Sequence, residues 1–358
     1  MIVFLSTFLF SLGNPLGIIM KLVTFKVHTE ERIGALLGDK VVDLNSAYAL
    51  LLKEKGELSA RRKADALLPQ CMIGFLEGGD ESMEAAKKAL TYAEKNPDAV
   101  GLDEEALVMC QCTAKLMAPI PRPGKVYCTA VNYYDHATER MKDPVARAAE
   151  IKRLKSLKLD VPDVFQKPPS LVVGPRDPLI KVKATEKMDY EVELTVVIGK
   201  EGKYITAEKA YEHIAGYTVM IDVSARDQGF PQDVDFGIFK RDVNWTKGKG
   251  MDNAGPMGPC IVTSDEIPDP YNPPLRLKTR VNGQERQNNT VEHMIIGIPR
   301  IIEYLSNGTT LKPGDVILSG TCGGVAGSWG PEGYLQIGDE LECEIQPIGT
   351  LKHKVIGE

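Results

Sequence analysis

Residues 187–200 read KMDYEVELTVVIGK, and β-branched residues fill the second half of this stretch before Gly199 closes it. That composition is typical of a β-strand. Three acids, Asp189, Glu191 and Glu193, fall at alternate positions between apolar residues. Because side chains alternate across a strand, these carboxylates share one face, with next-nearest neighbours about 7 Å apart. The stretch therefore predicts a strand that carries a row of negative charge.

Such an acidic row has two interpretations. A solvent-facing strand edge commonly alternates acids with apolar residues. A second predicted strand, residues 216–223, contains Asp222 near its end. A carboxylate buried after so apolar a run is costly unless it is paired or bound to a metal. Glu191, Glu193 and Asp222 together would offer the all-oxygen ligands that Mg²⁺ and Mn²⁺ prefer, so this combination favours a metal site.

Length and composition describe a globular chain. It has 358 residues, of which 43% are hydrophobic and 26% charged, and this length suggests two domains. A net charge of −6 without a long basic run argues against nucleic acid and membrane surfaces as partners. The seven cysteines include no CxxC pair. We therefore expect no structural zinc site or disulfide framework, but reduced thiols in a cytoplasmic protein.

The N-terminal end needs a separate interpretation. Residues 2–10 form an apolar run that resembles the core of a signal peptide, but no Lys or Arg precedes it. The run is too short for a transmembrane helix, and Asn14 and Pro15 follow it. We interpret residues 1–19 as an apolar N-terminal extension, with export as the alternative.

Residues 20–115 are expected to form a small N-terminal α+β domain. Its predicted strands lie at 22–27, 33–37 and 40–44, and its predicted helices at 47–53 and 81–94. The prolines of APIPRP, residues 118–123, then break the chain before a strand at Lys125. Residues 119–358 are expected to be β-rich, with helices near 207–214 and 292–305.

Six blocks of sequence carry a family resemblance. In order they are VNYYDHATE (131–139), DYEVEL (189–194), DVSARD (222–227), NWTKGKGMD (244–252), VNGQERQ (281–287) and LKPGDVILSGTCGGV (311–325). This series resembles the fumarylacetoacetate hydrolase (FAH) family over about residues 119–358. The resemblance implies an α+β, β-rich fold with an FAH-type mixed β-roll catalytic domain, a small N-terminal domain and a homodimer.

The resemblance also implies the residues of a site. The implied metal ligands, for Mg²⁺ or Mn²⁺ with Ca²⁺ as an alternative ion in a structure, are Glu191, Glu193 and Asp222. The implied catalytic residues are the lid dyad His136 and Glu139 and the lysine beside the substrate carbonyl, Lys249. The implied substrate-binding residues are Thr321, Arg226, Gln228 and Tyr133. Asp189 is expected at an edge or paired with a base.

The implied chemistry proceeds through an enolate. A 2-oxo acid or diketo acid chelates the cation, which stabilises the enolate, and Lys249 adds a second positive charge. Glu139, oriented by His136, takes a proton from water. Water attack gives carbon–carbon bond hydrolysis of an acylpyruvate, which we rank first. Oxaloacetate decarboxylation or tautomerisation, or 2-oxo-acid hydration or isomerisation, is the alternative, and a metal-binding scaffold of low activity is a third hypothesis.

Departures from the family pattern concern the substrate side of the site. The family often has a glutamine two residues after the acid of the SARD turn, whereas Gln228 follows Asp227 directly. Either Gln228 replaces it or the water-positioning contact is absent. Two insertions are predicted to shape the pocket. They are an amphipathic helix at 145–159, with Ala146, Ala149, Leu154 and Leu157, and a loop at 229–244, with Phe230, Phe236 and Phe239, which lines the substrate or packs in the core.

Overall fold

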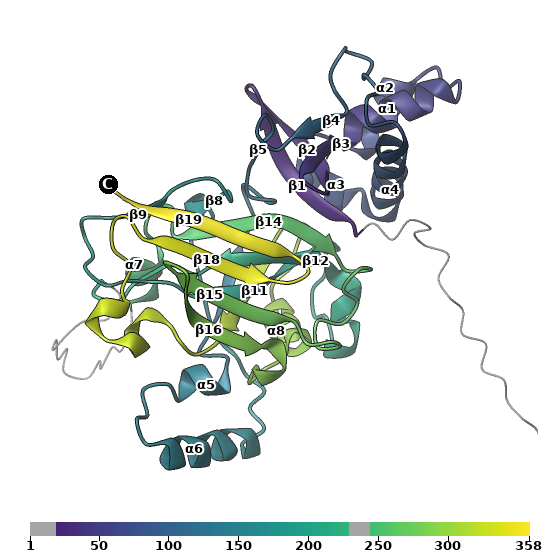
Figure 1. Ribbon diagram of the computed structural model, residues 1–358. Helices are drawn as coiled ribbons and strands as arrows, with labels where there is room; N and C mark the ends of the chain where they lie inside the picture. Colours follow the sequence, from purple (N-terminus) through teal and green to yellow (C-terminus); the bar gives the residue numbers. More distant parts are fainter. Residues whose placement is uncertain (1–18, 229–243) are drawn as a thin grey trace, which may run out of the picture.

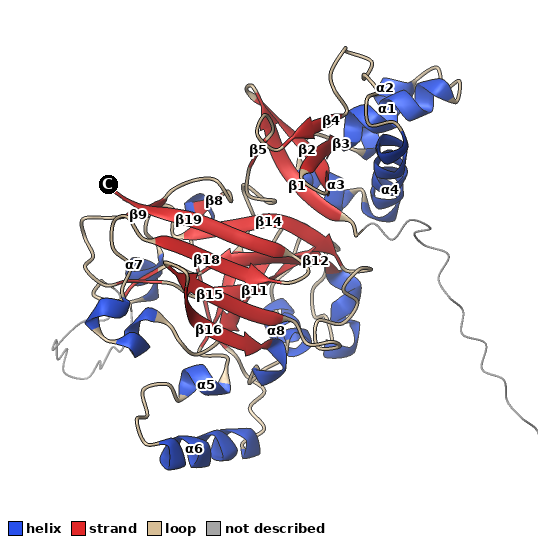
Figure 2. Ribbon diagram, in the orientation of Figure 1, coloured by secondary structure: helices blue, strands red, loops and turns tan. Residues whose placement is uncertain are grey.

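The computed structural model describes residues 19–228 and 244–358, and strands form most of the body (Figure 1). Figure 2 shows the helices lying around this strand-rich body and at its N-terminal end. The predicted α+β, β-rich class is confirmed. Of the N-terminal extension 1–19 only Ile19 is described, and Phe230, Phe236 and Phe239 lie outside the described residues.

The segment 20–115 has its first strands before its helices, as the sequence predicts. Its strands are β1 Lys21–Val27, β2 Glu30–Leu37, β3 Lys40–Asp43, β4 Val108–Cys110 and β5 Lys115–Leu116. Its helices are α1 Leu44–Glu54, α2 Ala60–Leu67, α3 Met72–Glu77 and α4 Gly79–Lys95. Helix α1 follows Asp43, whose carboxylate accepts a hydrogen bond from the Ser46 N–H at 3.1 Å and satisfies a donor at the helix end.

One edge of this segment continues the main sheet of the body. Strand β1 pairs antiparallel with β14 (Gly255–Thr263), with Lys21 opposite Val262. The large sheet therefore follows the order β4-β3-β2-β1-β14 and continues through β12 (Ile214–Ile221), β11 (Val192–Ile198), β17 (Val316–Thr321), β6 (Val126–Ala130) and β7 (Asp163–Gln166). The two predicted domains, residues 20–115 and 119–358, are thus joined through a shared sheet, and their independence as folding units stays a prediction.

Two sheets pack together in the body. The large sheet contributes β6 Val126–Ala130, β7 Asp163–Gln166, β11 Val192–Ile198, β12 Ile214–Ile221 and β17 Val316–Thr321. The second sheet contains β16 Gln284–Thr290, β15 Arg276–Val281, β18 Glu340–Ile345, β19 Gly349–Gly357 and β9 Leu179–Lys181, in that spatial order. Strand β11 lies at the centre, is buried along its whole length, and contacts β15 and β18 of the second sheet.

Shorter elements complete the described part of the body. The helices are α5 Tyr134–Ala137, α6 Pro144–Ser156, α7 Trp245–Lys249 and α8 Ile298–Ser306, and the short strands are β8 Val172–Val173, β10 Met188–Asp189 and β13 Ser224–Ala225. The 3₁₀ helices are Pro169–Leu171, Ala207–His213, Val291–His293, Ala326–Trp329 and Pro331–Gly333. Among the described residues no helix is both long and apolar enough to cross a membrane.

Three predicted elements differ from the structure. The single strand 187–200 is divided, because β10 pairs with β13 while β11 begins only at Val192. The helix expected near 207–214 is a 3₁₀ helix. The helix expected near 292–305 is a 3₁₀ turn followed by α8, since Gly297 is extended and serves as the N-cap of α8. Local turn geometry, which periodicity does not show, causes these differences.

Helix α6 matches the prediction at 145–159, but its apolar positions pack against little. None of its residues is buried, and Leu157 directly after it is 47% exposed. Figure 1 shows α5 and α6 projecting from one side of the body. The helix is held instead near its N-terminus, where Arg147 donates a hydrogen bond to the Asp135 carbonyl at 3.0 Å.

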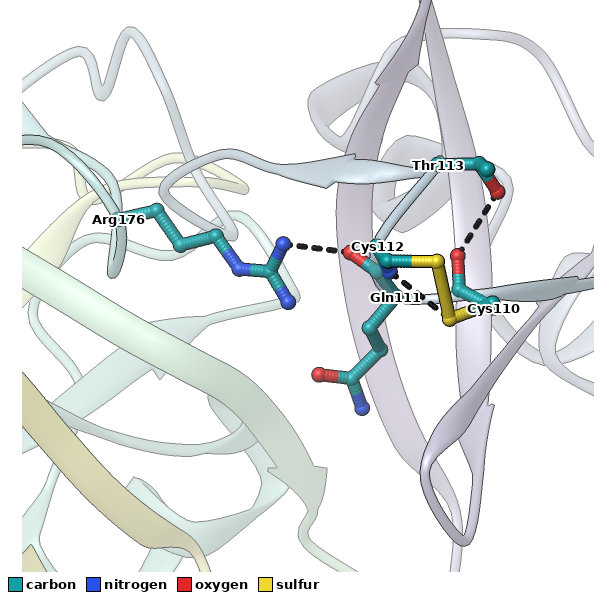
Figure 3. The surroundings of a disulfide bond; sticks show 5 residues. All are labelled: Cys110, Gln111, Cys112, Thr113 and Arg176. Atoms are coloured by element: carbon teal, nitrogen blue, oxygen red, sulfur yellow. Dashed lines mark hydrogen bonds between the residues drawn. A yellow bond between two sulfur atoms is a disulfide. The ribbon is translucent and has the colours of Figure 1, made fainter.

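The expectation that all cysteines are reduced thiols is wrong for one pair. Cys110 and Cys112 form a disulfide, and Figure 3 shows Arg176 donating to the carbonyl of the intervening Gln111. The turn after β4 brings the two Cα atoms to 5.2 Å, a separation that a disulfide spans. The five other cysteines are free, and only Cys71 of these is exposed.

Candidate active site

Strand register brings the three predicted metal ligands together. Val192 of β11 lies opposite Ile221 of β12, and the Asp222 N–H donates to the Glu191 carbonyl at 2.9 Å. Glu191 and Asp222 are therefore neighbours on one face, and Glu193 follows two residues later on the same face. One carboxylate oxygen from each lies within 4.8 Å of the others, and all three side chains are buried.

Two buried lysines contact this triad. The Lys249 ammonium lies 2.6 Å from Glu191 Oε2 and 2.6 Å from Asp222 Oδ2. The Lys167 ammonium lies 2.7 Å from Asp222 Oδ1 and donates to the Val223 carbonyl at 3.0 Å. Lys167 could not be predicted from the sequence, because a lysine before two prolines carries no signal of full burial.

Asp189 belongs to the same charged cluster. The Arg226 guanidinium lies 2.7 Å from an Asp189 oxygen and also pairs with Glu191. Asp189 is fully buried, and its other oxygen accepts a hydrogen bond from the Ala326 N–H at 2.6 Å. Of the two expectations for Asp189, pairing with a base is therefore confirmed. Arg226 is that base, and it links Asp189 to Glu191 of the triad.

The carboxylates are unequally compensated. Burial opposes ionisation of Glu191, but Lys249 and Arg226 outweigh it and hold the pKa of Glu191 below its ordinary value. Burial, with the charges of Asp222 and Glu191, raises the pKa of Glu193 well above its ordinary value. Glu193 accepts a hydrogen bond from the Gly320 N–H at 2.6 Å, but no Lys or Arg among the described residues pairs with it. Both the oxygen donors and this deficit of positive charge fit a hard divalent cation.

Lys249 is a permanent positive charge in this setting. Burial would lower its pKa, but Asp222 and Glu191 outweigh burial and raise the pKa above the ordinary value. Its ammonium also lies 5.2 Å from the centre of the Phe165 ring and 5.6 Å from the centre of the Trp245 ring. Lys249 is thus suited to stabilise a developing negative charge and unsuited to act as a base.

His136 and Glu139 form an ion pair at the cavity. His136 Nδ1 lies 2.8 Å from Glu139 Oε1, and Glu139 Oε2 accepts a hydrogen bond from the Gly324 N–H at 2.9 Å. Helix α5 contains His136 and ends at Ala137, so Glu139 lies in the turn that follows. Burial would lower the pKa of His136, but the hydrogen bond and charge of Glu139 outweigh burial and raise it above its ordinary value of 6.5.

We expect the Glu139→Gln substitution to lower the pKa of His136, because burial then acts without the opposing hydrogen bond and charge of the Glu139 carboxylate. In the wild type the raised pKa means that the folded state holds the proton more tightly. The stabilising contribution is therefore complete below pH 6.5 and is lost as the pH rises through the folded pKa. NMR titration of the His136 ring, assigned with a His136→Asn variant, measures this shift. An unchanged pKa in Glu139→Gln would contradict the account.

Thr321 lies opposite Glu193 in the pairing of β11 with β17. Its hydroxyl donates to the Val192 carbonyl at 2.9 Å and accepts from Gln287 Nε2 at 2.8 Å. The predicted contact with a substrate carboxylate therefore needs this hydroxyl to turn away from Val192. Gln287, which the sequence analysis did not single out, also accepts from the Val192 N–H at 3.2 Å and ties the second sheet to the base of the site.

A cavity of about 600 Å³ connects these groups. The predicted site residues that line it are His136, Glu139, Glu191, Glu193, Asp222, Arg226, Lys249 and Thr321. Phe165 and Trp245 form one wall, with their rings stacked at 4.7 Å. Tyr133 and Gln228 are not among the described lining residues. The Tyr133 side chain is fully buried, and Gln228 donates to the Ala184 carbonyl.

Replacing Lys167 with methionine should lower the free energy of unfolding of the metal-free protein by roughly 3–5 kcal/mol, because Asp222 loses a buried partner. Urea unfolding monitored by circular dichroism measures the loss. The matched control is Lys158→Met at an exposed position, which should change stability by less than about 0.5 kcal/mol. Equal stabilities of the two variants would contradict the assigned role of Lys167.

Comparison with known proteins decides the family. The model for the C-terminal domain of fumarylacetoacetate (FAA) hydrolase matches residues 125–356. The chain belongs to the fumarylacetoacetate hydrolase family. This match confirms the resemblance drawn from the sequence, and it covers every block on which that resemblance depends.

Relatives of this FAH-family chain match most of its length. The mitochondrial oxaloacetate tautomerase FAHD2A of Bos taurus is 37% identical over 289 residues, 81% of each chain. Oxaloacetate tautomerase YisK of Bacillus subtilis is 35% identical over 340 residues, 94% of this chain and 100% of that protein. The solved fumarylacetoacetate hydrolase of Exiguobacterium antarcticum has a TM-score of 0.68 and 29% identity, covering 95% of this chain and 100% of that one. The chain is therefore an enzyme of this family, with a candidate divalent-metal centre at the triad.

Proposed function

We propose that the protein catalyses keto–enol tautomerisation of oxaloacetate. Two of the relatives above are named oxaloacetate tautomerases. The observation that favours tautomerisation over hydrolysis is the position of Gln228, whose amide donates to the Ala184 carbonyl and does not line the cavity. Tautomerisation needs proton transfer alone, whereas hydrolysis needs a positioned water as well.

The cavity offers the parts of this reaction. A divalent cation held by Glu191, Glu193 and Asp222 would polarise the 2-oxo group and stabilise the negative charge of the enolate. Lys249 adds a fixed positive charge beside two of these three carboxylates, Glu191 and Asp222. Phe165 and Trp245 cover one side of the site and limit access of water.

The dyad supplies the proton transfer. In the direction from enol to keto form, the enol oxygen loses its proton and a carbon–hydrogen bond forms at C3. The protonated His136–Glu139 pair faces the cavity and is suited to deliver a proton to C3. It regains a proton as the enol oxygen releases one, so no net change in protonation occurs. The raised pKa of His136 keeps this proton available near neutral pH.

Carbon–carbon bond hydrolysis of an acylpyruvate, ranked first from the sequence, is the second candidate. The same His136–Glu139 dyad favours it, because a carboxylate beside a histidine can also activate water. Oxaloacetate decarboxylation releases CO2 and forms the enolate of pyruvate, which the same cation would stabilise, and breaking the C3–C4 bond needs no dyad.

A parallel assay separates these reactions. Purified protein with Mg²⁺ or Mn²⁺ is given enol-oxaloacetate, keto-oxaloacetate and acetylpyruvate, with Glu139→Gln as the comparison. The proposal expects rapid loss of the enol absorbance, little pyruvate formation and slow acetylpyruvate cleavage. Acetylpyruvate cleavage that is faster than loss of the enol and is abolished in Glu139→Gln would make hydrolysis the assigned reaction in place of tautomerisation. Release of pyruvate from oxaloacetate at the same rate in wild type and Glu139→Gln would make decarboxylation the assigned reaction.

The finer features of the assignment have separate support. We propose Mg²⁺ or Mn²⁺ as the metal, because the candidate ligands are carboxylate oxygens.

We propose a homodimer from the family pattern, and size-exclusion chromatography with light scattering tests it. We keep the cytoplasm as the proposed location. Mitochondrial relatives offer the alternative, and fractionation decides.

A further inference from the structure

The positive charges around the cavity fall into two groups. Lys249, Arg226 and Lys167 are each paired with buried carboxylates of the charged cluster. Arg140 and Lys187 also line the cavity. Neither forms an ion pair with a carboxylate of residues 19–228 or 244–358, so their charges are available to a bound anion.

These two cations reach the cavity from different segments. Arg140 directly follows Glu139 of the dyad and is exposed. Tyr334 lines the same cavity as Arg140. Burial raises the pKa of Tyr334, and the charge of Arg140 acts against that rise. Lys187 is half-buried, and its carbonyl accepts a hydrogen bond from the Arg226 N–H at 3.0 Å. Its backbone is therefore fixed beside the charged cluster.

The charge balance of the cavity floor gives these cations a role. Asp189, Glu191, Glu193 and Asp222 face the three paired cations, and when all four carboxylates are ionised, as metal ligation requires of the triad, this leaves a single net negative charge. A bound divalent ion changes this to a single net positive charge. The carboxylate next to the 2-oxo group of a substrate neutralises that charge. A second carboxylate on the substrate would therefore lie in the cavity without compensation, and an unpaired carboxylate removed from water is costly.

We propose that Arg140 and Lys187 bind the distal carboxylate of the substrate and thereby select dicarboxylic over monocarboxylic 2-oxo acids. The inference rests on the proposed function, because it places the 2-oxo end of the substrate at the triad. The guanidinium of Arg140 offers paired donors that match a carboxylate, and Lys187 offers a compact charge. The competing explanation is that both are solvated cations that attract any anion equally.

Oxaloacetate and pyruvate form a matched pair of probes, because they share the 2-oxo acid end and differ in the distal carboxylate. Calorimetry on the Mn²⁺-loaded protein measures the Kd of each for wild type, Arg140→Gln, Lys187→Gln and the double variant. Lys142→Gln and Lys183→Gln are the controls, since these exposed lysines lie in the same two segments and outside the cavity lining.

The expected result is a selective loss. Each single substitution should raise the Kd of oxaloacetate about fivefold, the effect of a partly exposed ion pair, and the double variant about 20-fold. The Kd of pyruvate and the two controls should stay within about twofold of wild type. Arg140→Glu should weaken oxaloacetate further and leave pyruvate unchanged. Wild-type protein that binds oxaloacetate no more tightly than pyruvate, or variants that weaken both ligands equally, would overturn the inference.

Two measurements keep this inference separate from the proposed function. If wild type binds oxaloacetate selectively through Arg140 and Lys187 but does not interconvert its tautomers, the proposed function fails and the inference stands. If wild type interconverts the tautomers but the double variant keeps the wild-type ratio of the two Kd values, the inference alone fails. In the supported case the double variant raises KM for oxaloacetate with little change in kcat, because the reacting atoms lie at the triad.

Discussion

Glu191→Gln should abolish tight Mn²⁺ binding and lower the rate of oxaloacetate tautomerisation at least about a thousandfold, a cost of about 4 kcal/mol in the transition state. The substitution keeps the size of the side chain and removes one of three ligand charges. Glu191 also pairs with Lys249 and Arg226, so the variant leaves two cations undercompensated beside the site. Added positive charge then opposes the binding of a divalent ion.

The measurement combines calorimetric titration with Mn²⁺ and an enol-oxaloacetate assay on the same preparations. Glu201→Gln, at an exposed position outside the cavity lining, is the matched control and should behave as wild type. Glu191→Gln protein that is folded by circular dichroism and still binds Mn²⁺ with wild-type affinity would rule out the triad as the metal centre.

Lys249→Met should have the second largest effect, with an opposite sign for metal affinity. Removing the ammonium that lies 2.6 Å from both Glu191 Oε2 and Asp222 Oδ2 frees these two oxygens for the cation. Arg226 and Lys167 keep the other oxygen of each carboxylate. Mn²⁺ should therefore bind at least as tightly as in wild type. The rate should still fall by about a hundredfold to a thousandfold, the usual cost of removing one group that stabilises a developing oxyanion.

The opposite effects of Lys249→Met on Mn²⁺ affinity and on rate show whether the Lys249 charge acts on the substrate or only neutralises the carboxylates. If Lys249 served only to neutralise the carboxylates, the Mn²⁺-loaded variant would keep the wild-type kcat. Lys249→Met protein with full activity would thus contradict the assigned role, as would a variant that loses Mn²⁺ binding together with activity. Lys247→Met, two residues earlier on α7 and outside the cavity lining, is the control.

Part of the triad could be predicted because its information is local. Alternate positions place Glu191 and Glu193 on one face of a strand, and Asp222 follows an apolar run that ends beside it. The pairing of His136 with Glu139 is also local, at a spacing of three residues. The family blocks then supplied Lys249 and Thr321, which the structure brings to the same cavity.

Contacts between distant segments could not be predicted in this way. Lys167 reaches Asp222 across 55 residues of sequence, and Gln287 reaches Val192 across 95. Their roles depend on which strands become neighbours, and residue periodicity does not encode that order. Tyr133 and Gln228 show that a match to a family block does not by itself place a side chain in the cavity. They lie in matching blocks, but Tyr133 is fully buried and Gln228 donates to the Ala184 carbonyl, and neither is among the described residues that line the cavity.

The central claim is that the triad is a divalent-metal centre for enolate chemistry, and one measurement tests it most directly. Protein stripped with a chelator is reconstituted with increasing Mn²⁺, and bound ion and enol-oxaloacetate conversion are measured on each sample. The account predicts negligible catalysis without metal and a rate that rises in proportion to bound Mn²⁺, up to a single ion per chain. A rate that is unchanged by removal of the metal, or that saturates without bound ion, would contradict it.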